Sequence, residues 1–240
     1  FSHTLDQPGI FTRSVQDAGW LAASLTGEGG KLSRSIPACS APPRLAAVKT
    51  PVWEQAGDDA QQNFRENIET IRKGGARVEE VELPEIFSHA HRAIRTIMAV
   101  ESALNLEELH RKQAPLLSST LKDFIAEGAA TGAVVYLQSL KLRLTLQDEL
   151  DRFLAKYDAV ITPPATGEAP ATLEQTGNPC FCSIWSLCGV PAITIPVGFG
   201  PHGLPLGLQI VGPRRKDGRT LSSAHWCEGL FSFPCWREKP

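Results

Sequence analysis

The chain has 240 residues, of which 42% are hydrophobic and 21% are charged. These proportions are ordinary for a globular protein and supply enough apolar material for a sizeable core. The formal net charge of -2 excludes the strongly basic surface that binds nucleic acid or an anionic membrane. The most apolar stretch, 189–200, contains two prolines and is too short to span a bilayer. We therefore expect no nucleic-acid partner and no membrane partner.

The beginning of the sequence and its cysteines bear on the compartment. There is no initial methionine, and the first residues lack the basic and apolar regions of a secretory signal. We expect a cytoplasmic protein, present here as a processed chain or as a piece of a longer one. The six cysteines are too sparse for a disulfide scaffold and lack the spacing of a metal site. Reduced thiols, with no metal and no cofactor, are the resulting expectation.

The N-terminal part of the chain predicts a helix followed by an α/β unit. Ser14 and Asp17 form an N-cap pattern before a helix that ends at glycines 27, 29 and 30. Residues 31–43 are rich in Ser and Pro and predict a connecting loop. Periodicity then predicts a strand at 45–48, a helix at 56–71 and a strand at 78–83. Short loops between these three elements favour a parallel crossover.

The rest of the chain is first helical and then rich in strands. Apolar stripes with charged opposite faces predict long helices at 90–104 and 133–157, which serve as scaffold. Later runs predict strands at 159–162, 192–197 and 206–211, and a last helix at 219–230. The turn-rich sequence 200–203 favours antiparallel pairing of the last two strands.

Two patterns resemble catalytic motifs but lack the residues or the spacing that those motifs require. The glycine-rich stretch 27–33 lacks the spacing of a phosphate loop and follows no strand, so a flexible connection is the better interpretation. The histidines have no metal spacing, and no G-x-S-x-G sequence precedes them. A Ser-His-Asp hydrolase is therefore unsupported.

The informative block runs from residue 157 to residue 213. It alternates apolar strands with Pro and Gly turns that fix sharp changes of direction. Asn178, before Pro179, stands at a helix entry, and the helix that follows carries Phe181 and Trp185. Aromatic side chains beside a few polar groups are typical of a small-molecule pocket, although a Trp at such a position is more often a core residue.

In this block the chain resembles the amidase-signature family. The phrases "YDAVITPPATGEAP", "TGNPCFCSIWSLCGVPAITIPVGF" and "GLPLGLQIVGPRRKD" follow the order of the family's C-terminal third. The phrases "SHTLDQPGIFTRSVQDAGWL" and "PPRLAAVKTPVWEQA" resemble the segments after the family's catalytic core. The resemblance implies an α/β/α fold with a mixed sheet, and makes residues 1–240 the C-terminal part of one amidase-signature domain.

The resemblance also implies a chemistry. Family members hydrolyse amides with a serine nucleophile, a second serine held by a cis peptide and a lysine base. The base is needed because a serine hydroxyl is a weak nucleophile until its proton is removed. No residue of this chain matches any of the three, so we expect no catalytic residue here, and we expect the catalytic core to lie upstream.

The resemblance places Thr176, Gly177, Asn178 and the helix 181–187 at the acyl side of the substrate pocket. Phe181, Cys182 and Trp185 become candidates for its wall. Asn178 has two interpretations, a substrate contact or a helix cap. A thiol enzyme is disfavoured because no histidine base lies near the cysteines in the sequence.

We expect an amidase whose substrate is a small-molecule amide, and which does not need a cofactor. Two alternatives stay open, the A subunit of a tRNA-dependent glutamine amidotransferase and a non-catalytic scaffold derived from the family. A homodimer is a further expectation. If half of the domain is absent, apolar helix faces and strand edges are exposed, and the isolated chain should self-associate.

Overall fold

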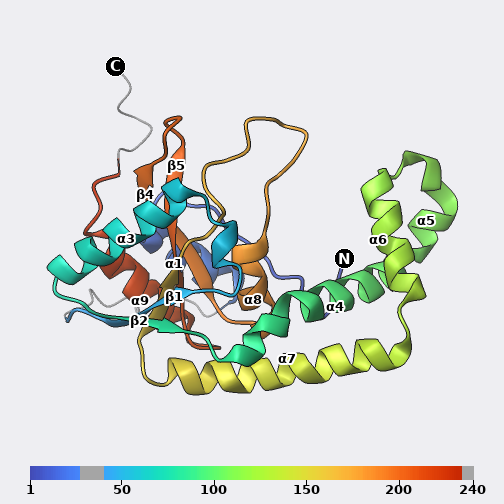
Figure 1. Cartoon of the computed structure of the whole chain (residues 1–240), viewed down its shortest axis with the longest axis horizontal. Coiled ribbons are helices and arrows are strands. Elements are labelled where there is room, and N and C mark those ends of the chain that lie inside the picture. The colour runs from blue at the N-terminus through green and yellow to red at the C-terminus, as the bar shows by residue number, and fades with distance from the viewer. Residues whose placement is uncertain (28–40, 234–240) are drawn as a thin grey trace.

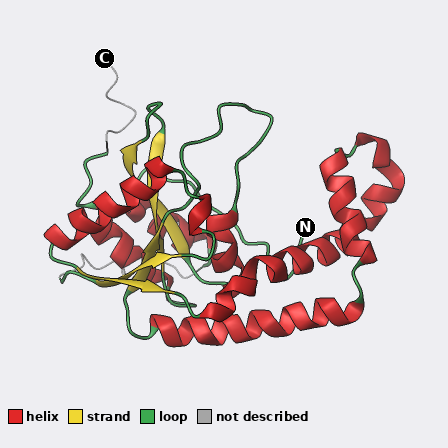
Figure 2. Ribbon diagram, viewed as in Figure 1, coloured by secondary structure: helices red, strands yellow, loops and turns green. Residues whose placement is uncertain are grey.

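A computed structural model describes residues 1–27 and 41–233, and it shows a five-stranded mixed sheet between two layers of helices (Figures 1 and 2). The strand order is β2-β1-β3-β5-β4. The strands are β1 (Arg44–Lys49), β2 (Arg77–Glu82), β3 (Ala159–Thr162), β4 (Ala192–Phe199) and β5 (Pro205–Val211). This architecture confirms the expected α/β fold with a mixed sheet.

The sheet is parallel on one side and antiparallel on the other. β1 pairs in parallel with β2 and with β3, whereas β5 pairs antiparallel with β3 and with β4. The strand–helix–strand unit at the start of the sheet is the parallel pair predicted from its short loops. The β4–β5 hairpin confirms the antiparallel pairing predicted from the turn at 200–203.

One helical layer packs through apolar side chains of α1, α3 and α9. The other packs through α4, α7 and α8. Alternate residues of β1 serve the two layers, because successive side chains of a strand point to opposite faces: Leu45 joins the first core and Ala46 the second. The bounds are α1 (Val15–Leu25), α3 (Asp58–Lys73), α9 (Asp217–Glu228), α4 (Ala90–Asn105), α7 (Ala133–Leu154) and α8 (Cys180–Cys188).

Local signals in the sequence account for several helix ends. The Ser14 side chain accepts a hydrogen bond from the Asp17 N–H and so caps α1, as predicted. Gly74 ends α3, and Gly75 follows at a φ of 103°, a left-handed conformation that favours glycine. The α1 helix stops at Leu25, before Gly27; glycines 29 and 30 and residues 31–40 of the expected loop lie outside the described residues.

Two helices between α4 and α7 were not predicted. These are α5 (Glu107–Gln113) and α6 (Ser119–Ala130), and they extend beyond the sheet in Figure 1. The α6 helix packs against α4 at Gly128, where a Cβ atom would lie 1.9 Å from the carbonyl oxygen of Ala99. Arg95 of α4 adds an ion pair with Glu127 at 2.6 Å. Within the described ranges, no helix has the length and apolar character needed to cross a membrane.

Candidate functional site

The carboxyl ends of β1 and β3 lie at one edge of the sheet because the two strands are parallel. Ligands of open α/β sheets commonly bind outside this edge. The segment 163–179 leaves β3 there and leads into α8, while β5 runs antiparallel to β3 and begins there. The residues predicted to bind substrate, 176–178 and those of α8, stand at and after the end of this segment, and Asn178 contacts Gln55, which follows β1.

The N-terminal end of α8 is fixed by three polar contacts. The Asn178 side-chain oxygen accepts a hydrogen bond from the Cys180 N–H at 3.0 Å, and its amide nitrogen donates to Gln55 Oε1 at 3.0 Å. His91 of α4 lies with Nε2 2.8 Å from the Cys180 carbonyl oxygen. Asn178 thus performs the capping role, and its alternative role as a substrate contact stays a prediction.

The C-terminal end of α8 is held by α7. Arg143 Nε donates to the Leu187 carbonyl at 2.9 Å, and Gln147 Nε2 donates to the Cys188 carbonyl at 3.0 Å. Gly189 follows at a φ of 65°, the left-handed ending that glycine adopts without strain. With both ends bonded, α8 has a fixed position over the sheet.

The loop that precedes α8 is anchored near its beginning. The Thr166 carbonyl accepts a hydrogen bond from the Gly57 N–H at 2.7 Å. The Glu168 carboxylate accepts from the Leu204 N–H at 2.8 Å and lies 2.7 Å from His202 Nδ1. Burial acts to raise the pKa of Glu168, but the hydrogen bonds from the β4–β5 turn outweigh it and lower the pKa. The loop is therefore tied both to the start of α3 and to the hairpin.

Cys182 connects α8 to the sheet. Its thiol donates to the Pro164 carbonyl at 3.3 Å, and Gln209 Nε2 of β5 donates to its sulfur at 3.4 Å. Desolvation raises the pKa of the Cys182 thiol, and the Gln209 hydrogen bond offsets this only in part. The neutral thiol is a poor nucleophile, so the geometry gives Cys182 a packing role rather than a chemical one.

Several buried polar atoms near this edge have no hydrogen-bond partner among the described residues. Thr162 and Gln209 are paired residues of β3 and β5, and Thr162 Oγ1 and Gln209 Oε1 both lack a partner. Both residues are at most 2% exposed. Unpaired buried polar atoms are rare, and Gln209 also contacts Cys182 of α8, so it marks a polar spot between α8 and the sheet. Thr50, directly after β1, and Trp185 of α8 have unpaired atoms as well.

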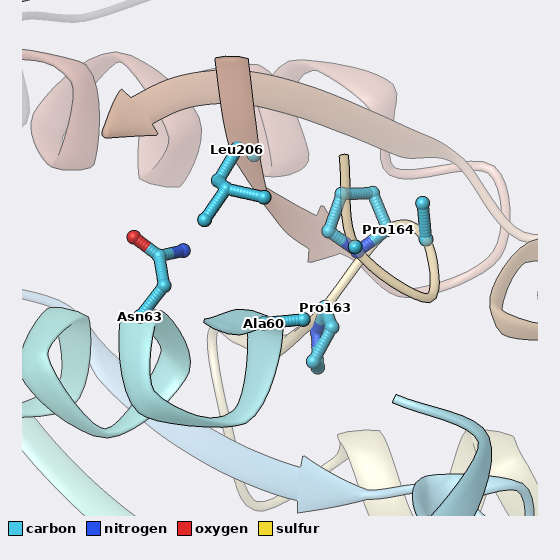
Figure 3. Close-up of a pocket in the computed structure, with 8 residues that line it drawn as sticks. Ala60, Asn63, Pro163, Pro164 and Leu206 are labelled. Carbon is cyan, nitrogen blue, oxygen red and sulfur yellow. The ribbon is translucent and has the colours of Figure 1, made fainter. Parts of the chain in front are cut away.

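A small hollow opens at the same edge, next to α3 (Figure 3). Asn63 of α3 directs its amide toward Leu206, and Pro163 and Pro164 form the facing wall. Gly207 has no room for a side chain, since a Cβ atom would lie 2.9 Å from Pro164 Cγ. The hollow is lined by Ala60, Asn63, Pro163, Pro164, Ala165, Gly167, Leu206 and Gly207.

The six residues predicted to bind substrate fall into two groups. Thr176, Gly177 and Asn178 are exposed at the end of the loop, and Cys182 is exposed on α8. Phe181 and Trp185 are 0% and 1% exposed. Phe181 packs with Ala56 and Ala60, and Trp185 belongs to the core between α8 and the sheet. Their role as pocket walls stays a prediction, and in this chain both are core residues.

Sequence reasoning missed the residues that hold the site together. Gln209 stands alone as a polar residue in the apolar run 206–211, and such an isolated polar residue in a buried strand was the available signal. Gln55, His91, Arg143 and Gln147 carried no local signal, because their partners lie far away in the sequence. No group of three His, Cys, Asp or Glu side chains suited to a metal ion occurs in residues 1–27 and 41–233.

The layers, strand order and carboxyl-edge segments define a three-layer α/β protein. The family model described as Amidase matches residues 1–221, and the chain belongs to this family, as its resemblance to amidase-signature proteins predicted. A solved structure described as an amidase superposes with a TM-score of 0.80 at 26% identity, over 92% of this chain and 52% of the other.

The curated relatives carry a more specific description. The A subunit of the glutamyl-tRNA(Gln) amidotransferase of Halothermothrix orenii is 25% identical over 100% of this chain and 58% of the relative. The corresponding protein of Lysinibacillus sphaericus is 29% identical over 97% of this chain and 56% of the relative. The solved amidotransferase structure from Thermotoga maritima, also of the A subunit, gives a TM-score of 0.69 at 23% identity, covering 93% of this chain and 52% of the other. The chain thus spans between 52% and 58% of the lengths of these four proteins.

Proposed function

We propose that this chain is the C-terminal part of an amide hydrolase that converts a small carboxamide to a carboxylate and ammonia or an amine. The observation that carries the proposal is the superposition on a solved amidase, with a TM-score of 0.80 over 92% of the chain. Within the proposal, the serine pair and the lysine base lie in the part of the domain that the chain does not cover. The 240-residue chain by itself is then inactive.

Within this proposal, the described residues hold and shape the substrate side of the site. The caps on α8 and the anchors on residues 166 and 168 place the loop 163–179 at the carboxyl edge of the sheet. The two groups that form hydrogen bonds with the Cys182 thiol are neutral, the Pro164 carbonyl and the Gln209 amide. A neutral carboxamide can exchange hydrogen bonds with such groups without a buried charge. The unpaired thiols of Cys180, Cys182 and Cys188 support a reducing, cytoplasmic location for the enzyme.

The A subunit of a tRNA-dependent glutamine amidotransferase is the second candidate. It is favoured by curated relatives of that description at 25% and 29% identity. The stand-alone amidase ranks first because the superposition on the solved amidase has the higher TM-score, 0.80 against 0.69 for the solved amidotransferase chain. A non-catalytic scaffold is the third possibility from the sequence, and it differs from both enzymes in releasing no ammonia.

The test is ammonia release by the polypeptide that the complete reading frame encodes, with the 240-residue chain in parallel. The substrates are simple aliphatic and aromatic amides and L-glutamine. We expect release from simple amides by the complete product alone. Release from glutamine only, and only with a co-purifying partner protein, would move the assignment to the amidotransferase. Hydrolysis by the 240-residue chain would show that a nucleophile lies within it, and no release by either form would favour the scaffold.

A further inference from the structure

The α7 helix leaves one long face uncovered. Its 22 residues make it about 33 Å long, at 1.5 Å per residue. Its inner side packs into the core through Leu146, Leu150 and Leu154. Figure 1 shows the helix along one edge of the molecule, with α4 and the sheet on its inner side. The outer side of α7 is therefore accessible to another molecule along most of its length.

Large apolar side chains and charged side chains share this outer side. Val134, Leu137 and Leu144 are 66%, 61% and 57% exposed, and their spacings of three and seven residues put them on one face of the helix. Five exposed polar residues lie on the same face. We name this surface the α7 face, and it consists of Val134, Leu137, Gln138, Lys141, Leu144, Thr145, Asp148 and Arg152.

Two opposite charges stand near the middle of the α7 face. Lys141 and Asp148 are seven residues apart, which is about 10 Å along the helix and too far for an ion pair between them. Neither forms an ion pair with another residue that the structure describes. Arg152, by contrast, is paired with Glu149 at 2.5 Å. Lys141 and Asp148 are therefore both available to an outside partner.

The positions of these two charges suit a second copy of the chain. In a dimer with two-fold symmetry the same surface meets itself, so that residue i contacts residue j and j contacts i. Two antiparallel α7 helices with the symmetry axis between Leu144 and Thr145 would place Lys141 opposite Asp148 of the partner subunit. Symmetry repeats this pair once, with the exposed Leu144 side chains beside the axis.

The same charges disfavour other arrangements of two α7 helices. A symmetry axis at residue 141 would bring two lysines together, and an axis at residue 148 would bring two aspartates together. A parallel pair would set each charge against its own kind. Like charges that face each other act against wrong pairings, and a polar residue among apolar contact positions fixes the register of paired helices. The antiparallel arrangement about Leu144 is the one in which opposite charges meet.

We propose that the α7 face is the interface of a homodimer, in which two antiparallel α7 helices pack about Leu144 and form two Lys141–Asp148 ion pairs between the subunits. The proposal does not depend on the proposed amidase function, because it uses the α7 face alone. A face about 33 Å long and about 10 Å wide is small for a protein interface. We therefore expect a dissociation constant of roughly 1–100 µM.

The first experiment measures the molecular mass of the complete product by analytical ultracentrifugation, at concentrations below and above the expected dissociation constant. Leu144→Asp places a charge at the centre of the interface, and Leu116→Asp, at a site that is 81% exposed outside α7, is the matched control. We expect the wild type and the control to dimerise equally, and Leu144→Asp to raise the dissociation constant at least about tenfold, since residues at an interface centre carry most of the binding energy. Melting curves check that each variant is folded.

The second experiment exchanges the two charges. Lys141→Asp alone, or Asp148→Lys alone, would set like charges against each other across the interface, and each should raise the dissociation constant at least about tenfold. The double variant restores opposite charges, and we expect it to dimerise as the wild type does. A general effect on folding would add up in the double variant, whereas only a contact between these two residues allows restoration.

The other outcomes overturn the proposal. A complete product that stays monomeric would show that another part of the protein, or no second copy, covers the α7 face. A dimer that Leu144→Asp leaves intact would place the interface elsewhere. Single charge variants without effect, or a double variant that stays weakened, would reject the Lys141–Asp148 pairing. Ammonia release is measured separately, so each of these results leaves the amidase assignment unchanged.

Discussion

Helices α8 and α1 start from similar sequences and end in different surroundings. The α8 helix has no charged residue and α1 has only Asp17. The α8 helix is packed into the core on the α4–α7 side, with hydrogen bonds at both ends. The α1 helix is covered on its inner side only. The apolar composition of a helix thus favours its burial, whereas the other elements of the fold determine whether it is buried.

The replacement of one tryptophan in each helix tests the difference between α8 and α1 most directly. Trp185→Ala removes a side chain that is 1% exposed, and we expect it to lower the free energy of unfolding by about 3–5 kcal/mol because it leaves a cavity. Trp20→Ala, at a site that is 58% exposed, should change the stability of the 240-residue chain by under about 0.5 kcal/mol. Urea unfolding followed by circular dichroism measures both. Equal losses would mean that α1 is as well enclosed as α8.

A buried carboxylate holds the segment that leads to α1, and its removal should have the next largest effect. Glu101 of α4 accepts hydrogen bonds from the Ser2 and Thr4 hydroxyls, from the Thr4 N–H at 3.0 Å and from the Tyr136 hydroxyl at 2.8 Å. Burial acts to raise the pKa of Glu101, but these donors outweigh it and lower the pKa. We expect Glu101→Gln to cost about 2 kcal/mol at pH 7, because hydrogen bonds to a charged group are the stronger ones.

The same carboxylate predicts a pH dependence. Because the pKa of Glu101 is lower in the folded state, its stabilising contribution is complete above the ordinary pKa of about 4.3 and is lost as the pH falls below it. The difference in melting temperature between the wild type and Glu101→Gln should therefore shrink from pH 7 to pH 3. A constant difference over this range would argue that the loss comes from packing. Exposed Glu107→Gln is the control.

The hydrogen bonds at the C-terminal end of α8 should make a smaller contribution to stability. Gln147→Ala removes the donor to the Cys188 carbonyl and also the acceptor of an Arg214 hydrogen bond. We expect a loss of about 1–2 kcal/mol, because a buried carbonyl is left without its partner. Gln138→Ala, at an exposed position of the same helix, should be close to neutral. The melting temperatures of the two variants, measured by thermal unfolding, test this expectation. Equal melting temperatures would show that the hydrogen bond to the Cys188 carbonyl does not stabilise the protein.

The smallest expected effect concerns the two roles of Asn178. Asn178→Ala should cost about 1 kcal/mol by removal of the cap on Cys180, whereas Asn178→Asp keeps an acceptor and should retain most of the stability. Kinetics of the complete product then separate the roles. If Asn178 only caps α8, Asn178→Asp leaves KM for a simple amide unchanged. A rise in KM with retained stability would place Asn178 in contact with substrate.

Regular elements were the part of the fold most accessible from sequence. The strands at 45–48 and 159–162 were predictable because buried strands read as short apolar runs between turn residues. The N-cap at Ser14 was visible because its partner is three residues away. Helices α5 and α6, which lie outside the sheet layers (Figure 1), were missed. The packing of α6 on α4 depends on Gly128 meeting Ala99, a contact that periodicity does not reveal.

The candidate site was located by sequence but not assembled by it. Residues 176–178 and the helix after them were predicted to line the substrate pocket, and the contact of Asn178 with Gln55 places their start on the side of the sheet where β1 ends. The contacts of Cys182 with Gln209, and of Asn178 with Gln55, span 27 and 123 residues. Contacts of this range come from the packing of whole elements, and no local pattern encodes them.

Periodicity, turn residues and ordered phrases are local properties of a chain, and they were enough to predict the family and the mixed α/β architecture. Other features come from the packing of the elements: Trp185 lies in the core and Trp20 at the surface, Glu101 is a buried anchor, and α8 is bonded at both ends. Burial and hydrogen bonding depend on which elements pack against each other. Which elements pack together is a property of the folded molecule as a whole.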